Sequence, residues 1–416
     1  MNVLLVHQNF PGQFKHLAPQ LVARGDRVVA LTMNVAPDMP GVEVRNAKPT
    51  IGTASKLPWA QDFETKLIRG EAALRAAMAL RDEGFYPDVI VGHPAWGDTL
   101  FVKEVWPEAR FGIYCEFFYS DTNGDADFDP EFPVPGNEVA RRVRLKLKTL
   151  PQRLHFPLAN AGISPTRFQA DTYPAIFRDR ITVIHDGIDT DRIAPRTDGS
   201  IRLGDGRTIT RADEVVTFVS RNLEPYRGYH IFMRALPELL RRRPNARVFL
   251  VGGDGVSYGA APAKGSWRDL FLNEVRDKLD MSRVHFVGHL PYDVFLGLLS
   301  ITRLHIYLTY PFVLSWSLIE AMALGAPILG SDTAPVREVI EHGRNGILTP
   351  FFDPAALAAQ ASEMLEDDDL RLRLSAAARQ TAVEGYDLKR VCLPRQLQWI
   401  DALAAQTPRP ALFDDD

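Results

Sequence analysis

Cysteine is scarce in this chain of 416 residues, which contains only Cys115 and Cys392. Two cysteines cannot form a disulfide framework or a metal cluster by themselves, and they are typical of a reducing compartment. The first residues, MNVLLVHQNF, lack a basic leader and a sustained apolar region, so no secretion signal is predicted. No stretch has enough apolar residues in a row to cross a bilayer. We therefore expect a cytoplasmic protein.

The chain also lacks an excess of one charge, with 48 Lys and Arg against 52 Asp and Glu. Without an overall basic surface, nucleic acid is not an expected partner. The hydrophobic fraction of 46% and the charged fraction of 24% are those of an ordinary globular protein. A chain of this length exceeds what one hydrophobic core usually supports, so two domains are expected.

Strand-like and helix-like segments alternate along the whole chain, which predicts an α/β fold with parallel sheets covered by helices. The candidate strands of the first half are Val3–His7, Arg27–Thr32, Val42–Arg45, Asp88–Gly92, Arg110–Glu116, Gly162–Pro165 and Thr182–Ile184. Those of the second half are Val215–Ser220, Arg247–Val251, Val284–Val287, His305–Leu308, Pro327–Gly330 and Gly346–Leu348. Between them, SIRLGDGRTITRAD predicts a small hairpin turned by Asp205 and Gly206.

The stretch YPFVLSWSLIEAMALGAPILGSD, from Tyr310 to Asp332, contains the most informative pattern in the chain. Ser315 is expected to open a helix that Gly325 and Pro327 end. Glu320 is the one acid within this apolar helix. It is either a buried carboxylate that requires a partner or a partly exposed residue on the solvent side, and the spacing leaves both interpretations open.

The segment EAMALGAP, from Glu320 to Pro327, resembles the second half of the signature of retaining glycosyltransferase family 4, E-x-F-G-x-x-x-x-E-A-x-A-x-G-x-P. The resemblance implies the GT-B fold, with two Rossmann-like doubly wound domains facing across a cleft. It also implies that Glu320 holds the ribose hydroxyls of a nucleotide-sugar. Phe312 stands where the family has its first acid, which contacts the transferred sugar, and Ser315 replaces the glycine.

A second motif, RNLEPYRG, follows a predicted strand and leads into a helix, a position suited to a diphosphate. The family has an Arg and a Lys at this spacing, so the resemblance implies that Arg221 and Arg227 bind the diphosphate. Arg227 in place of Lys keeps the charge and adds a planar fork of donors. These two arginines would stabilise the leaving diphosphate without a metal.

Other loops at predicted strand ends supply the remaining candidates. Gly12 belongs to a turn that either is a simple tight turn or approaches the donor diphosphate, as the family implies. His93 is either a structural histidine bonded to nearby backbone or catalytic. Glu116, where many relatives have a histidine, can accept hydrogen bonds from sugar hydroxyls. The resemblance implies further donor-binding positions at Gly253, Leu290, Val313, Leu314 and Ser315.

Two charged segments leave alternatives open. The acids between Gly124 and Glu131 alternate as hard-cation ligands can, but the spacing also suits a solvated loop near the acceptor, so no metal is expected. The segment Arg141–Arg153 is cationic, with an apolar face at Val143, Leu147, Leu150 and Leu154 and an interruption at Pro151. It is either a solvated helix face or a surface for anionic lipid or a phosphate-bearing acceptor. Peripheral contact with the inner face of a membrane would follow from the second interpretation.

The resulting prediction is a glycosyltransferase, with a hexose as the sugar moved. Residues 1–187 would bind the acceptor, residues 188–387 the nucleotide-diphosphate sugar, and the tail at 388–416 would cross back to the first domain. The acceptor would be a glycan, a lipid-linked molecule or a small molecule, and no cofactor is expected. The alternatives are a non-catalytic glycosyltransferase-like partner protein, which Phe312 motivates, and a GT-B enzyme acting on a soluble sugar phosphate.

Overall fold

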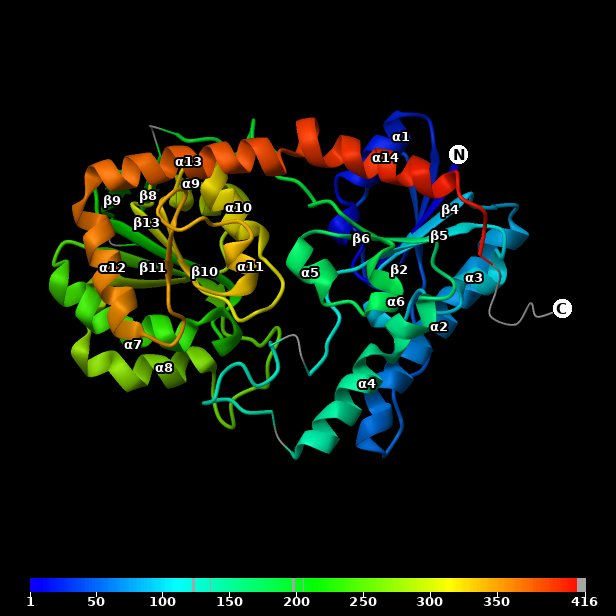
Figure 1. Cartoon of the computed structure of the whole chain (residues 1–416), viewed down its shortest axis with the longest axis horizontal. Coiled ribbons are helices and arrows are strands. Elements are labelled where there is room, and N and C mark those ends of the chain that lie inside the picture. Colours follow the sequence, from blue (N-terminus) through cyan, green and yellow to red (C-terminus); the bar gives the residue numbers. More distant parts are fainter. Residues whose placement is uncertain (122–123, 135, 197–198, 205, 410–416) are drawn as a thin grey trace. The chain divides into compact units, whose positions relative to one another are not determined.

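A computed structural model describes residues 1–121, 124–134, 136–196, 199–204 and 206–409. The chain forms two compact units (Figure 1). The first contains Met1–Asp186 together with the chain from Lys389 onward, and the second contains Gly187–Leu388. The expected divisions, after residues 187 and 387, lie one residue from these boundaries.

The first unit is built on a parallel sheet of seven strands in the order β3-β2-β1-β4-β5-β6-β7. Its strands are β1 Asn2–Val6, β2 Arg27–Thr32, β3 Val42–Asn46, β4 Val89–Gly92, β5 Arg110–Tyr114, β6 Ala161–Ser164 and β7 Ile181–Val183. In β1, the four residues from Val3 to Val6 are 0% exposed, because helices cover both faces of a parallel sheet.

The second unit has a parallel sheet of six strands in the order β12-β11-β10-β13-β14-β15. Its strands are β10 Val215–Asn222, β11 Arg247–Gly253, β12 Val284–Gly288, β13 Leu304–Tyr307, β14 Ile328–Ser331 and β15 Ile347–Thr349. Every strand expected from the sequence is present in the two sheets, with differences only at the strand ends. The predicted fold class is therefore confirmed.

Helices surround each sheet (Figure 1). Those of the first unit are η1 Gly12–Phe14, α1 Leu17–Ala23, α2 Pro58–Asp82, η2 Pro94–Trp96, α3 Val102–Val105, α4 Glu138–His155, α5 Arg167–Asp171, α6 Ala175–Arg178 and α14 Leu393–Ala404. Those of the second are η3 Pro225–Arg227, α7 Tyr229–Arg242, α8 Trp267–Val275, η4 Arg276–Lys278, η5 Met281–Arg283, α9 Tyr292–Ser300, α10 Trp316–Ala323, α11 Ala334–Arg337, α12 Pro354–Glu366 and α13 Asp368–Tyr386. Among the described helices, none combines the length and apolar character that a bilayer crossing requires.

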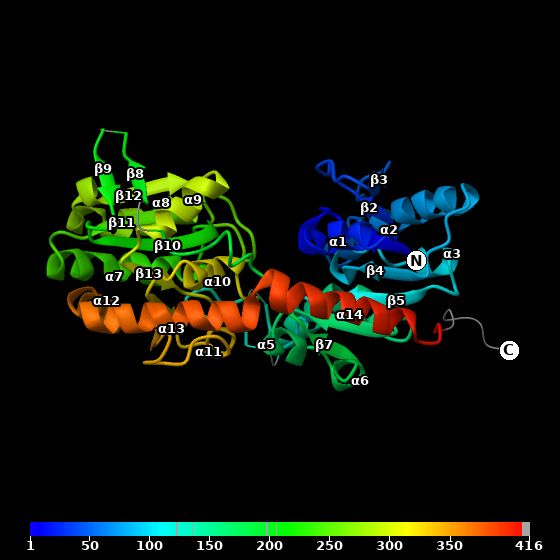
Figure 2. The same ribbon diagram turned by 90° about the horizontal axis from the view of Figure 1, so that it is seen from above.

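The predicted hairpin is present and projects from the second unit (Figure 2). Its antiparallel strands are β8 Ser200–Arg202 and β9 Thr208–Thr210. Asp205, expected in the turn, lies outside the described residues, whereas Gly206 has the positive φ of 88° that a tight turn requires.

The end of the chain returns to the first unit, as expected. A short π-helical segment, Leu388–Cys392, leads into α14, which packs against α1, β4 and β5. A Cβ on Gly112 of β5 would meet the Trp399 ring of α14 at 2.6 Å, so glycine is required for this close approach.

The helix α4 differs from the expectation in two respects. It runs through Pro151 as one helix, because packing against α2 and η2 offsets the hydrogen bond that the proline removes. The expected apolar face is also incomplete, because Leu154 is 39% exposed. Apart from Pro151, the side chains that α4 buries near its end are polar, namely Thr149, Gln152 and His155.

Candidate functional site

Each sheet has one point where the strand order reverses, between β1 and β4 in the first unit and between β10 and β13 in the second. Open α/β sheets bind ligands beyond the carboxyl ends of the strands at such points. In the first unit, His7 and His93 follow the two strands. In the second, these loops carry Arg227 and the segment that begins at Leu308.

A polar network joins the predicted residues of the first unit. Gln13 connects two of its members: Nε2 of His7 lies 2.7 Å from Gln13 Oε1, and Gln13 Nε2 donates to Glu116 Oε1 at 3.3 Å. Nε2 of His93 lies 3.4 Å from Glu116 Oε2. Sequence reasoning placed His93 and Glu116 but missed His7 and Gln13, although both are at or just beyond the end of the first strand.

His93 is oriented by its own loop. Its Nδ1 accepts a hydrogen bond from the backbone N–H of Ala95 at 3.3 Å, so the proton of a neutral ring is on Nε2, which faces Glu116. The ring stacks on Trp96, with 4.2 Å between ring centres. The expected structural bond to nearby backbone is therefore present, and it leaves Nε2 directed at the Glu116 carboxylate.

One member of this network, His7, and a neighbouring acid, Asp98, have shifted pKa values. Burial, followed by the nearby His93, lowers the pKa of His7 to about 4, so its imidazole is neutral at pH 7. Burial raises the pKa of the Asp98 carboxyl to about 7, against the opposing influence of His93. Asp98 thus titrates near neutral pH beside His93.

The raised pKa of Asp98 predicts a pH-dependent effect of Asp98→Asn on stability. Below pH 3.8, the pKa in the unfolded chain, Asp98 is protonated in both the folded and the unfolded state. Its ionisation then contributes nothing to the free energy of unfolding. As the pH rises from there to about 7, only the unfolded chain ionises, so the parent loses stability. The asparagine variant avoids this loss. Its melting temperature should exceed that of the parent by several degrees at pH 8 and match it near pH 4.

Thermal melts between pH 4 and pH 9 test this expectation, with Asp179→Asn, an exposed aspartate of the same unit, as the matched control. An advantage of Asp98→Asn that does not grow with pH would contradict the assignment.

Gly12 is required by packing. Its φ is +46°, and a Cβ there would meet Cε1 of the His7 ring at 2.3 Å. The glycine therefore lets the turn close on His7. The simple tight turn explains this residue fully, and a role toward the donor stays a prediction.

In the second unit, Arg227 is buried, with 5% of the residue exposed. Its Nη1 donates to Thr309 Oγ1 at 2.8 Å and to the Val313 carbonyl at 3.0 Å. Within the described residues, no carboxylate lies within ion-pair distance of this guanidinium. A buried cation without an anionic partner is costly, which is unusual for a purely structural arginine.

Aromatic rings take the place of a carboxylate around Arg227. The guanidinium carbon lies 5.0 Å from the centre of the Tyr258 ring and 6.0 Å from that of Phe312. These two rings are in contact, with 5.0 Å between centres, and Tyr226 lies 5.4 Å from Phe312. Phe312, 3% exposed, thus packs within an aromatic cluster. Tyr258 was missed because it lies in the loop after β11, which no spacing connects to Arg227.

The loop that carries Tyr258 is fastened by Glu224, a buried acid of the same motif as Arg227. The Glu224 carboxylate accepts the backbone N–H of Ser257 at 3.1 Å and that of Tyr258 at 3.2 Å. Burial raises the pKa of Glu224, against the opposing effect of these donors. Glu224 therefore sets the position of Tyr258 over Arg227.

The other two predicted positions near strand ends are Arg221 and Gly253. Arg221, near the end of β10, is exposed. A Cβ on Gly253 would meet His289 Nε2 at 2.4 Å and Asn222 Oδ1 at 2.7 Å, so this position requires glycine where the β10, β11 and β12 loops converge. Leu290, in the same group of loops, is partly buried against the core.

Glu320 is 8% exposed, so the interpretation of a solvent-side residue is wrong. Its partner is Tyr292, whose hydroxyl donates to Glu320 Oε1 at 2.5 Å. Burial and the adjacent carboxylate raise the pKa of Tyr292, which therefore remains a donor at neutral pH. The sequence analysis did not single out Tyr292, which opens α9 directly after the loop that carries Leu290.

The helix α10 begins as the sequence indicated. Ser315 is its N-cap residue, and its hydroxyl accepts the N–H of Ser317 at 3.3 Å. Leu314 is 8% exposed and belongs to the core, and Val313 contributes its carbonyl to Arg227.

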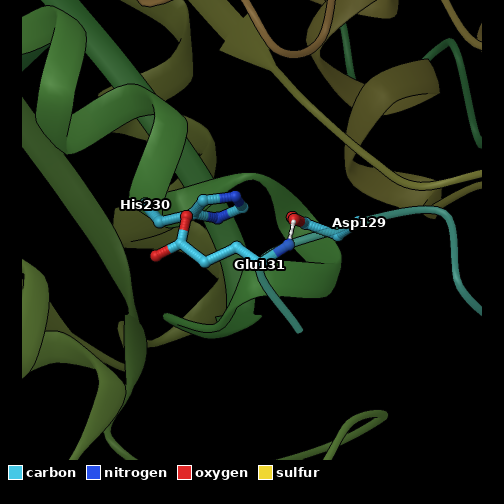
Figure 3. A group of neighbouring side chains, drawn as sticks. All are labelled: Asp129, Glu131 and His230. Atoms are coloured by element: carbon cyan, nitrogen blue, oxygen red, sulfur yellow. Dashed lines mark hydrogen bonds between the residues drawn. The ribbon is translucent and has the colours of Figure 1, made fainter. Parts of the chain in front are cut away.

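The acidic segment Gly124–Glu131 is partly used by contacts within the first unit. The backbone N–H of Glu131 donates to Asp129 Oδ1 at 2.9 Å (Figure 3). Asp127 forms an ion pair with Arg141 at the start of α4. These contacts account for two of the acids, and the absence of a metal stays a prediction.

Two family models match the chain. One, described as the glycosyl transferase family 4 group, matches residues 24–193, and the other, glycosyl transferases group 1, matches residues 207–381. Among curated proteins, glycogen synthase of Mycobacterium tuberculosis is 23% identical over 99% of this chain and 98% of its own. Phosphatidyl-myo-inositol mannosyltransferase of Mycolicibacterium smegmatis is 32% identical over 47% of this chain and 44% of its own.

Solved structures share the whole fold. Sucrose-phosphate synthase of Thermosynechococcus elongatus matches with a TM-score of 0.74 and 17% identity, covering 98% of this chain and 100% of its own. The HepE protein of Anabaena in complex with UDP-glucose matches with a TM-score of 0.65 and 16% identity, covering 97% of this chain and 100% of its own.

Two parallel sheets with candidate ligand positions at their reversal points, each matched by a glycosyltransferase model, define a GT-B glycosyltransferase. The enzyme moves a sugar from a nucleotide sugar. The chain belongs to glycosyltransferase family 4, with a group 1 second domain.

Proposed function

We propose that this enzyme transfers a hexose from a nucleotide-diphosphate sugar to an acceptor hydroxyl, with retention of anomeric configuration and without a metal or other cofactor. The donor binds the second unit and the acceptor binds the first. The observation that carries the proposal is the buried guanidinium of Arg227, which has two neutral acceptors and no carboxylate partner among the described residues. A diphosphate supplies the missing negative charge.

The remaining residues take roles that their surroundings support. Arg221, exposed at the end of β10, adds a second cation for the diphosphate. Glu320, held by Tyr292, accepts hydrogen bonds from the ribose hydroxyls. Glu116 and His93 bind sugar hydroxyls, since both are polar groups at strand ends of the first sheet. The loops with Gly12, Gly253, Leu290 and Leu314 shape the donor site.

No protein nucleophile is required in this scheme. The glycosidic C–O bond breaks toward the diphosphate, whose developing charge Arg221 and Arg227 stabilise. The departing phosphate oxygen takes the proton of the attacking acceptor hydroxyl, and the new bond forms on the same face of the sugar.

A thermal-shift screen of nucleotide-sugars, followed by product analysis, tests the proposal. UDP-glucose is the first donor to try, because HepE of similar fold was solved in complex with it. The expected result is stabilisation by one nucleotide series and an α-linked product from an α-linked donor. An inverted product would overturn retention, and binding without turnover across acceptors would favour the non-catalytic alternative.

Metal independence gives a separate prediction. Removing divalent ions with EDTA should leave the turnover number unchanged, since the arginines supply the positive charge that a metal would otherwise provide. The measurement is the initial rate before and after chelation, with added Mg²⁺ as the control. A reproducible loss of activity that added Mg²⁺ or Mn²⁺ reverses would contradict the proposal. It would make Asp125 and Asp129 the first candidates for a metal site.

We also propose a cytoplasmic enzyme that contacts anionic lipid at the inner face of a membrane through Arg141–Arg153. The support is the charge of this segment in α4, which presents Arg142 and Lys146 to solvent. Cys115 and Cys392 are buried and form no disulfide in the structure, which suits the same compartment. Co-sedimentation with vesicles containing phosphatidylglycerol, against phosphatidylcholine vesicles, measures this contact.

A further inference from the structure

A small basic cavity lies beside the candidate site of the first unit. It has a volume of about 130 Å³ and forms between α4 and the segment after β5. Its polar lining consists of Tyr119–Asp121 from that segment and Arg142, Lys146, Thr149 and Arg153 from α4. Three cations and one carboxylate therefore border the cavity.

The cations share one face of α4 because their spacing follows the helical repeat. Arg142 pairs with Asp121 at 3.0 Å and with Glu138 at 2.6 Å, so its charge is partly compensated. Lys146 has no ion pair among the described residues, and Arg153 lies over the Phe118 ring, 5.0 Å from its centre. Two cations of the cavity thus have no carboxylate opposite them.

The wall that faces α4 is held in place. Gln152 Nε2 donates to the Phe117 carbonyl at 2.8 Å, and Nζ of Lys148 lies 3.3 Å from the centre of the Tyr119 ring. These contacts tie the segment after β5 to the helix at two points. The cavity is therefore a fixed feature of the first unit.

The cavity is also close to Glu116. Only two residues separate Glu116 from Tyr119, so their Cα atoms lie at most about 11 Å apart. An acceptor whose hydroxyl reaches Glu116 can therefore place a neighbouring group in the cavity.

We propose that this cavity binds an acidic group of the acceptor, a phosphate or a carboxylate, through Lys146 and Arg153. The inference rests on the proposed function, because it names the acceptor class of the site at Glu116. The acidic group can belong to a soluble sugar phosphate or to a lipid headgroup, since both present the same oxygens to the cations.

Methyl phosphate is the probe for the cavity, titrated by ³¹P line broadening in the presence of saturating UDP. Lys146→Gln and Arg153→Gln should each raise its Kd about threefold to tenfold, because each removes one charge-assisted contact. Binding should weaken as NaCl is added. Lys48→Gln is the matched control, an exposed lysine in the loop after β3 at the other edge of the sheet, and should bind as the parent does.

Parent-like binding of methyl phosphate by both cavity variants, or no binding by the parent, would overturn the proposal. The same variants should leave UDP affinity unchanged, so a failure of the cavity is distinguishable from a failure of the donor site. Vesicles of phosphatidylglycerol and phosphatidylcholine decide the source of the acid. If methyl phosphate displaces the parent protein from phosphatidylglycerol vesicles, the acidic group belongs to a lipid headgroup. If the parent protein binds methyl phosphate but not the vesicles, the acidic group belongs to a soluble acceptor.

Discussion

Arg227→Ala should lower the turnover number by about 100-fold or more, because it removes the buried cation that we propose to face the leaving diphosphate. The guanidinium is surrounded by aromatic rings and two neutral acceptors, so its charge is poorly screened by water. The measurement is the initial rate of product formation at saturating donor.

Stability must be measured in the same variant, since Arg227 is 5% exposed and its removal leaves Thr309 Oγ1 and the Val313 carbonyl without this donor. Unsatisfied buried groups cost about 1–3 kcal/mol, so a lower melting temperature is expected. Arg227→Lys is the matched variant that separates the two effects. It keeps the charge but not the planar fork, so it should recover much of the rate.

Arg221 provides the complementary test, because its side chain is exposed and its loss should hardly affect the fold. Arg221→Ala should also lower turnover by about 100-fold. Near-normal rates in both alanine variants, with any donor, would remove the two arginines from the mechanism.

Glu320→Gln should weaken the binding of free nucleotide as well as of nucleotide-sugar. Hydrogen bonds to a charged group contribute about 1.5–3 kcal/mol, so the Kd should rise about tenfold to a hundredfold. Calorimetry with the nucleotide alone measures this effect without turnover. If nucleotide affinity is unchanged, Glu320 is a structural residue of α10 and the ribose site lies elsewhere.

Variants at Tyr292 and Phe312 test whether Glu320 binds the nucleotide and whether position 312 acts on the sugar. Tyr292→Phe removes the hydroxyl that orients Glu320 and keeps the carboxylate, so it should weaken nucleotide less than Glu320→Gln does. Phe312→Glu restores the acid of the family beside Arg227, whose guanidinium carbon lies 6.0 Å from the Phe312 ring. Because the new carboxylate lies beside Arg227, its effect on the sugar is the change in the difference between the affinities for nucleotide-sugar and nucleotide. A matching loss for nucleotide and nucleotide-sugar in Phe312→Glu would contradict this division of roles.

The amino-acid sequence by itself determined the strands, their parallel arrangement and the type of each candidate residue. Alternating apolar runs and helix formers are local signals, and they placed every strand of the two sheets. The resemblance to the family pattern also singled out Glu320, Arg221 and Arg227 as candidates, and their roles stay predictions. Ser315 was recognised as a helix start because capping depends on the next few residues only.

The tertiary structure decided which of these residues are buried and what they contact. Tyr258 covers Arg227, which lies 31 positions earlier in the chain. Tyr292 binds Glu320, which lies 28 positions later. Gln13 connects to Glu116 across 103 residues. Such pairs depend on how strands are ordered in a sheet, which is a long-range property. The same reason explains α4, whose basic face borders a cavity only because the loop after β5 folds against it.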